Sequence, residues 1–335
     1  MIDFNKKKSK ILFYEIIEGR SKCLDPFDNK FLYIKHFGDL DSSRFEEFYF
    51  IHYDQAVNRG LPTEKEREKY LKEEGLWSES KDLILSNKTE ELEKLNESKA
   101  KAYLISKINQ NKKDIDRLEQ EIKNIRKEKT DLIGLTAETY AQNKMEYNYI
   151  YNSFHTDETL KYKKFDSQDF EIESIGQFNK YVETHNKIME KFNIKNIKYL
   201  ALSEFFQNML HLCENKAYYF FQKPLHDLTY YQTSLFSYGK YYSTVLSSSD
   251  MRKIKNEIKE DPDKLMEWYN TSKNLENKMM QNGPKEGMVF VNEATEEDLA
   301  HLNQDSPQQQ SALDKLAKEK GGTLSLTDLA QFFKK

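Results

Sequence analysis

The residues from Leu76 to Ile133 include no glycine and no proline, so this stretch can form helix without interruption. Between Asp82 and Asp131, 23 of 50 residues are charged, 12 of them basic and 11 acidic. The apolar residues recur at heptad spacing, which is typical of a coiled coil with a solvated exterior. They form two series: Leu85, Leu92 and Leu95, followed by Ile108, Ile115, Leu118, Ile122, Ile125 and Leu132.

The two heptad series are out of register with each other. Counting by sevens from Leu85 reaches Lys99 and Ser106, whereas the second series passes through Ile108. An offset of two residues is neither a stutter nor a stammer, so one continuous coiled coil fits poorly. A break within residues 100–106 allows each arm to cover the apolar stripe of the other. The sequence therefore predicts a charged antiparallel helical hairpin over residues 76–133.

The first 75 residues have a mixed character. The runs Lys10–Ile17 and Lys30–Phe37 are rich in Ile, Phe and Tyr, and turn-forming residues lie between them. This pattern predicts a β-hairpin. A helix is expected from about Ser42 to Asn58, with Gly60 as its left-handed C-terminal residue. Thr63 and Glu66 have the spacing of a capping box and predict a short helix after Pro62. We expect a small α+β element.

Residues 134–282 carry the strongest core signal, including helices that begin near residue 137 and residue 172. Two apolar stripes at helical spacing follow, and Pro224 separates them. We expect the two helices to pack together as an aromatic core. His185 lies on an apolar helix face and is expected to be a core histidine. The Asp261–Pro262 pair has the form of a helix start. The stripes are Leu202, Phe205, Phe206, Met209, Leu210 and Cys213, then Leu228, Tyr231, Leu235, Tyr238, Tyr242 and Val245.

After Gly283 the sequence becomes polar, with a QDSPQQQ run and a Gly-Gly pair. Residues 283–335 are therefore expected to form a flexible tail. A short apolar helix is predicted at its end, with Leu326, Leu329, Phe332 and Phe333 as candidate partner-docking residues. Packing of this helix on its own domain is an equal alternative. The expected fold class is mainly α, with four parts: residues 1–75, 76–133, 134–282 and 283–335.

The overall charge argues against a dedicated nucleic-acid binder. There are 52 basic and 56 acidic residues, which gives a formal net charge of −4. The one basic cluster, Lys6 to Lys8 with Lys10, is interpreted as a solvated terminus rather than a phosphate contact. Cys23 and Cys213 are expected to be reduced thiols in a cytoplasmic protein. No run is long and apolar enough to suggest a membrane span.

No residue pattern indicates catalysis, a cofactor or a bound metal. Metal-ligand spacings, nucleotide-binding glycine loops and nucleophile elbows do not occur. Three local groups are the nearest candidates: His52-Tyr53-Asp54, His211 with Cys213, and His226-Asp227. In the first two, neighbouring side chains on a helix diverge. In the third, Asp227 is expected to be an N-cap. We therefore predict no catalytic, cofactor-binding or metal-binding residue.

Three stretches together resemble structural or assembly proteins encoded in the tail gene clusters of large contractile-tailed phages. They are AVNRGLPTEKE…LKEEGLW followed by the charged coil, then LIGLTAETYAQNKMEYNYIYNSF, and then LSEFFQNMLHLCENKAYYFFQKPLHDLTYYQTSLFSYGKYY. The order covers roughly residues 30–280. The resemblance is to tail assembly chaperones and baseplate-hub components, and it implies no catalytic residue.

The expected function is therefore that of a non-enzymatic phage tail assembly protein. It would contact other tail proteins, such as the tape measure, tail tube or baseplate hub, in the host cytoplasm or in the virion tail. No membrane or nucleic-acid partner is expected. One alternative is a coiled-coil scaffold of a bacterial cell. The other is an enzyme or nucleic-acid-processing factor that uses the region of His226 and Asp227.

Overall fold

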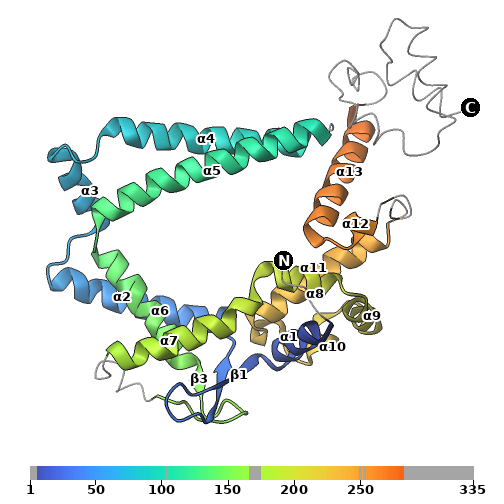
Figure 1. Cartoon of the computed structure of the whole chain (residues 1–335), viewed down its shortest axis with the longest axis horizontal. Coiled ribbons are helices and arrows are strands. Elements are labelled where there is room, and N and C mark those ends of the chain that lie inside the picture. Colours follow the sequence, from blue (N-terminus) through green and yellow to red (C-terminus); the bar gives the residue numbers. More distant parts are fainter. Residues whose placement is uncertain are drawn as a thin grey trace, which may run out of the picture. The chain divides into compact units, whose positions relative to one another are not determined.

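The structure of the chain is a computed structural model that describes residues 6–102, 105–165, 175–248, 251, 254 and 256–282. The chain divides into two compact units, whose helices and strands are shown in Figure 1. The first unit contains residues 1–69 and 133–265, and the second contains residues 70–132 and the chain from residue 266 onward.

The first unit consists of helices around a small sheet. Its elements are α1 (Lys6–Glu18), β1 (Arg20–Leu24), β2 (Phe31–Lys35), α2 (Asp39–Asn58), α6 (Ala137–Ser153), β3 (Phe154–His155), α7 (Ile175–Met189), η2 (Glu190–Phe192), α8 (Ile194–Leu202), α9 (Glu204–Leu212), α10 (Ala217–Phe221), η3 (Leu225–Asp227), α11 (Tyr230–Leu246) and α12 (Asn256–Lys259). Helix α3 (Glu64–Glu73) and helix α13 (Pro262–Asn282) each cross from this unit into the second. The second unit is built on α4 (Glu79–Lys101) and α5 (Ile105–Ile133).

The sheet is antiparallel, in the order β1-β2-β3. The prediction for Lys30–Phe37 is confirmed by β2, but the prediction of a strand over Lys10–Ile17 is wrong, because these residues lie in α1. Leu12 and Ile16 are four residues apart on one helix face, and both are buried. Burial of that stripe outweighs the strand preference of the Ile-, Phe- and Tyr-rich run. The first strand is instead the more polar β1.

The sheet packs through aromatic side chains against α6 and α7. Phe154 and Phe165 both meet the ring of Tyr181 edge to face, with ring centroids 5.4 Å and 4.9 Å away. The hydroxyl of Tyr181 donates to Asp25 in the β1–β2 turn at 3.2 Å, and Lys164 pairs with the same carboxylate at 2.8 Å. Burial raises the pKa of Asp25, but the bond from Lys164 and further donors outweigh it, so this pKa lies below its ordinary value.

The two predicted apolar stripes pack together, as expected. Leu210 and Phe206 on α9 are fully buried, and so is Leu235 on α11. The backbone of α11 comes very close at Gly239, where an added Cβ would lie only 2.4 Å from Phe206 Cε1. The first stripe is not one continuous helix, because Ser203 interrupts it between α8 and α9. Met209, predicted to be core, is 40% exposed.

Several predicted helix ends are confirmed. Gly60 has φ +82° after α2, Thr63 and Glu66 form their capping box, and the Asp261 carboxylate caps α13. The prediction that Asp227 is an N-cap is wrong. Thr229 caps α11 instead, and the Gln232 side chain completes the box.

The second unit confirms the predicted helical hairpin. Helices α4 and α5 run antiparallel (Figure 1), with α4 ending at Lys101 and α5 beginning at Ile105. Ile108, Ile115 and Leu118 of α5 are buried, and Leu85 and Leu92 of α4 are half-buried. Polar contacts between the arms proceed in opposite directions along the two helices. These are Lys81–Glu128 at 2.6 Å, Lys88–Glu121 at 2.5 Å and Ser98–Asn111 at 3.1 Å.

The base of the hairpin is organised around Asp82. Its carboxylate pairs with Lys72 at 2.7 Å and Lys129 at 3.2 Å, and it accepts a hydrogen bond from the indole nitrogen of buried Trp77 at 2.9 Å. The bond from Lys72, together with those from Trp77 and Lys129, lowers the pKa of Asp82 to about 2. This carboxylate therefore links the end of α3 to both arms of the hairpin.

The fold is mainly helical, with an N-terminal sheet, a charged antiparallel hairpin and an aromatic-rich core. The predicted tail, residues 283–335, lies outside the described residues. Within the described ranges, no helix has the length and apolar character needed to cross a membrane.

Candidate functional site

The partner-docking residues predicted from the sequence, Leu326, Leu329, Phe332 and Phe333, lie outside the described residues. Their role therefore stays a prediction. The residues that the structure describes offer a different candidate, a groove beside the sheet.

His226 and Asp227 lie on the exposed 3₁₀ turn η3. The His226 Nε2 atom is 3.6 Å from Asp227 Oδ1, and the two side chains are 66% and 50% exposed. This distance is too long for a hydrogen bond. The arrangement is that of a weak surface ion pair when the histidine is protonated.

The other two local groups are not brought together into sites. His52 is buried, and its Nδ1 atom lies 3.1 Å from Gln55 Oε1. It therefore acts as a core residue of α2, while Tyr53 and Asp54 occupy other faces. His211 is exposed on α9, and Cys213 is half-buried. Both cysteines of the chain are free thiols.

A buried Ser21–His36 contact was not expected from the sequence. The Ser21 hydroxyl lies 2.9 Å from His36 Nε2, and both residues are almost fully buried. Burial, with smaller effects from Lys191 and His185, lowers the pKa of His36 to about 3. The Ser21 hydroxyl also donates to Glu15 Oε2 at 3.3 Å, so these contacts join β1 to β2 and to α1 in the interior of the unit. In the described part of the chain, no group of three His, Cys, Asp or Glu residues could hold a metal ion.

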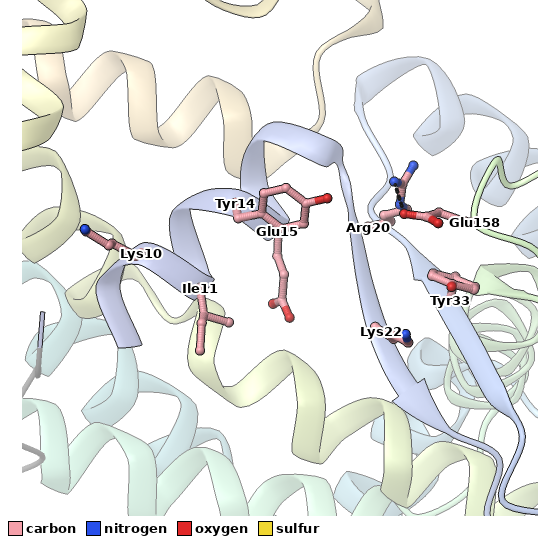
Figure 2. A pocket seen from close by; sticks show the side chains of 8 residues that line it. All are labelled: Lys10, Ile11, Tyr14, Glu15, Arg20, Lys22, Tyr33 and Glu158. Atoms are coloured by element: carbon pink, nitrogen blue, oxygen red, sulfur yellow. Dashed lines mark hydrogen bonds and ion pairs between the residues drawn. The ribbon is translucent and has the colours of Figure 1, made fainter. Parts of the chain in front are cut away.

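An open groove lies in the first unit between α1 and β1, with a volume of about 530 Å³. Figure 2 shows Ile11, Tyr14 and Glu15 of α1 on one side, and Lys22 and Tyr33 of the sheet on the other. Lys10, Arg20 and Glu158 complete the lining.

The apolar wall of the groove is formed by α1. Ile11 is 49% exposed and Tyr14 is 58% exposed, because they lie on the side of α1 opposite to buried Leu12 and Ile16. A helix that buries one face normally places polar residues on the other. Large exposed apolar side chains beside a groove are typical of a contact surface.

The charges in the groove are only partly neutralised. Glu15 pairs with Lys191 at 2.5 Å, and Arg20 pairs with Glu158 at 2.9 Å. Lys22 lies over the ring of Phe31, 3.7 Å from its centroid. Neither Lys10 nor Lys22 forms an ion pair with any residue that the structure describes. The groove therefore offers two unneutralised positive charges.

Little in the sequence indicates this groove. Its one local signal is the alternation in RSKCL, where Ser21 and Cys23 face inward and Arg20, Lys22 and Leu24 face outward. That segment is too polar to be chosen over the neighbouring aromatic run.

Comparisons with protein-family models, with curated proteins and with solved structures found no match to this chain.

Proposed function

We propose that this chain is a non-enzymatic assembly component of a contractile phage tail, of the tail assembly chaperone or baseplate-hub type. It acts through contacts with other tail proteins. The observation that carries the protein-contact role is the groove between α1 and β1. Its exposed apolar wall, its two unneutralised lysines and its neighbouring strand suit a polypeptide ligand better than a small molecule.

The assignment to a phage tail rests on the resemblance of three sequence stretches. Two of them lie against each other in the first unit, where α2 and its following turn pack on α6. The amide of Ala137 donates to the carbonyl of Pro62 at 3.0 Å, and the amide of Glu64 donates to the Glu138 carboxylate at 2.8 Å. These contacts join parts of the two stretches within the first unit.

The hairpin separates the proposal from the scaffold alternative. In a scaffold that dimerises by coiled coil, the heptad seam must be available to another chain. Here α5 buries Ile108, Ile115, Leu118 and Ile122, and the contacts across the seam come from α4 of the same chain. Self-association through the seam is disfavoured because the seam is occupied within the chain, although the outer face of α4 exposes Leu83 and Ile84 beside its charged residues.

The test is co-expression of the tagged chain with the proteins encoded beside its gene. We expect a tail tube, tape-measure or hub protein to be retained at a fixed ratio. The same tagged chain with Lys195→Glu, an exposed residue on α8, serves as a charge-change control that keeps binding. Retention of no neighbour, or of neighbours that belong to no tail cluster, would refute the proposal.

A further inference from the structure

The outer edge of β1 presents unpaired backbone. Because β1 is the first strand in the order β1-β2-β3, one of its edges has no neighbour among the strands that the structure describes. Two backbone hydrogen bonds lie at the ends of the β1–β2 pair. The His36 N–H donates to the Gly19 carbonyl, and the Asp25 N–H donates to the Lys30 carbonyl. Antiparallel pairs alternate between bonded and non-bonded positions. The backbone N–H and C=O groups of Ser21 and Cys23 therefore point toward β2. Those of Arg20, Lys22 and Leu24 point away from the sheet, toward its open edge.

This edge is open to another strand. No hydrogen bond within the described ranges uses the outward backbone groups of Arg20, Lys22 or Leu24. The strand contains no proline, and its register with β2 shows no bulge, although both devices commonly protect an edge. A central lysine is another such device, but Lys22 folds back over Phe31 on the sheet face. The groove runs beside this edge (Figure 2).

The edge and the groove together define the chemistry of a ligand. Free N–H and C=O groups select an extended backbone. Ile11 and Tyr14 suit apolar side chains on one face of that strand, and Lys10 with Lys22 suits carboxylates beside them. The matching segment is an alternating or continuous run of strand-forming residues flanked by Asp or Glu.

This chain carries such a segment after the end of α13. Residues 288–291 read Met-Val-Phe-Val, and Val289, Phe290 and Val291 favour extended structure. Glu286 precedes the run, and Glu293, Glu296, Glu297 and Asp298 follow it. The charge is opposite to that of the groove lysines.

We propose that residues 287–292 of a second copy add to the β1 edge as an extra strand. The proposal rests on the protein-contact role of the groove and names its occupant. Only five residues separate Asn282 from Met288, and they span at most about 18 Å. Within one chain the segment is thus tied to the second unit, whereas β1 belongs to the first, and a second copy can supply the segment whatever the arrangement of the two units. In such a contact the tail segment of one copy binds the β1 edge of the next copy. Because the two surfaces differ, repeating the contact from copy to copy gives rings or filaments.

The test uses the full chain in a sedimentation series over protein concentration. Lys22→Glu damages the groove, and Val289→Pro removes a backbone donor and breaks the strand. We expect the wild type to self-associate and each variant to associate at least about tenfold more weakly. Lys195→Glu is the matched charge control and should associate like the wild type. Melting curves check that Lys22→Glu leaves the fold intact, and Tyr14→Ser provides a second groove variant.

Mixing the two variants decides between a second copy and the same chain. The Lys22→Glu protein keeps an unchanged segment 287–292, and the Val289→Pro protein keeps an unchanged groove between α1 and β1. We expect their mixture to form a one-to-one dimer that neither forms alone. A monomeric wild type, association that both variants leave unchanged, or a mixture that stays monomeric would overturn the proposal. Tail-partner retention in the co-expression test is a separate measurement, so failure here leaves the proposed function standing.

Discussion

The side-chain amide of Asn111 donates a 3.1 Å hydrogen bond to the hydroxyl of Ser98, inside the seam between α4 and α5. Asn111 is 3% exposed and lies between the buried apolar residues Ile108 and Ile115. A polar residue at one seam position costs stability but selects the register in which it finds a partner. The pair therefore fixes how the two arms of the hairpin align.

Cysteines at these two positions should form a disulfide within one chain. The double variant Ser98→Cys with Asn111→Cys places thiols at facing seam positions, so mild oxidation should give an intrachain crosslink seen on a non-reducing gel. The control pairs Ser98→Cys with Leu118→Cys, one heptad or about 10 Å farther along α5, and should crosslink poorly. Crosslinks found only between chains would mean an intermolecular coiled coil.

The hairpin could be predicted because its signal is local and repeated. A long stretch without glycine or proline, with heptads out of phase, leaves few other structures. The N-terminal element shows the opposite case. Lys10–Ile17 has the composition of a strand, but it forms a helix because Leu12 and Ile16 are buried against distant parts of the chain. Strand preference depends on such packing, which one local segment does not contain.

Gly239 should tolerate no larger residue. An alanine Cβ there would lie 2.4 Å from Phe206 Cε1, and buried Leu210 and Tyr242 limit any rearrangement. Gly239→Ala should lower the free energy of unfolding by about 1–3 kcal/mol, measured by urea denaturation. Gly176→Ala is the matched control, since nothing lies within 4 Å of its Cβ position on α7. It should cause no loss. Equal effects of both substitutions would contradict the close packing of α9 on α11.

Mild acid should destabilise the first unit before the second. Burial lowers the pKa of His36 from 6.5 to about 3 and also lowers that of His155 and His185. Below about pH 6.5 the unfolded chain therefore binds protons that the folded unit does not. Each histidine contributes a slope of up to about 1.4 kcal/mol per pH unit. This stability is present above about pH 6.5 and falls as the pH decreases.

The stability of the second unit depends on Asp82 at lower pH. Its folded pKa is about 2, against 3.8 without its partners, so its contribution is present above about pH 4 and is lost as the pH falls toward 2. Both tryptophans, Trp77 and Trp268, belong to the second unit. On acidification, tryptophan fluorescence should therefore change after the far-ultraviolet circular dichroism begins to fall. The reverse order would contradict this assignment.

Replacing His226 and Asp227 together with alanine should leave partner retention close to that of the wild type. Both side chains are exposed, and the distance between them is 3.6 Å, so the stability change should stay within about 0.5 kcal/mol. The measurement combines a melting curve with retention of the tail partner in the co-expression assay. Loss of function with an unchanged melting curve would revive the enzymatic alternative.

The groove could not be predicted from the sequence, for a physical reason. Its edge exists because β1 is the outermost strand, and strand order is set by pairing among β1, β2 and the distant β3. Its apolar wall exists because α1 turns Leu12 inward and leaves Tyr14 outward. The predicted N-cap role of Asp227 was wrong for a local reason, because Thr229 and not Asp227 starts the next helix.

Deletion of residues 323–335 should weaken binding to a tail partner while leaving the melting temperature nearly unchanged. The segment regains an apolar face in Leu326, Leu329, Phe332 and Phe333. Burial of each such side chain contributes roughly 1.5–3 kcal/mol before the ordering cost. Leu329→Asp with Phe333→Asp should reproduce the loss. A melting temperature several degrees lower after the deletion would instead place the segment in the core.

A role in tail assembly is best tested by quantitative mass spectrometry of tail assembly intermediates alongside purified virions. We predict that this chain is recovered with tail proteins at a constant ratio in the intermediates, whether or not it remains in the finished particle. Recovery from the host lysate, with no enrichment in either intermediates or virions, would contradict a role in tail assembly.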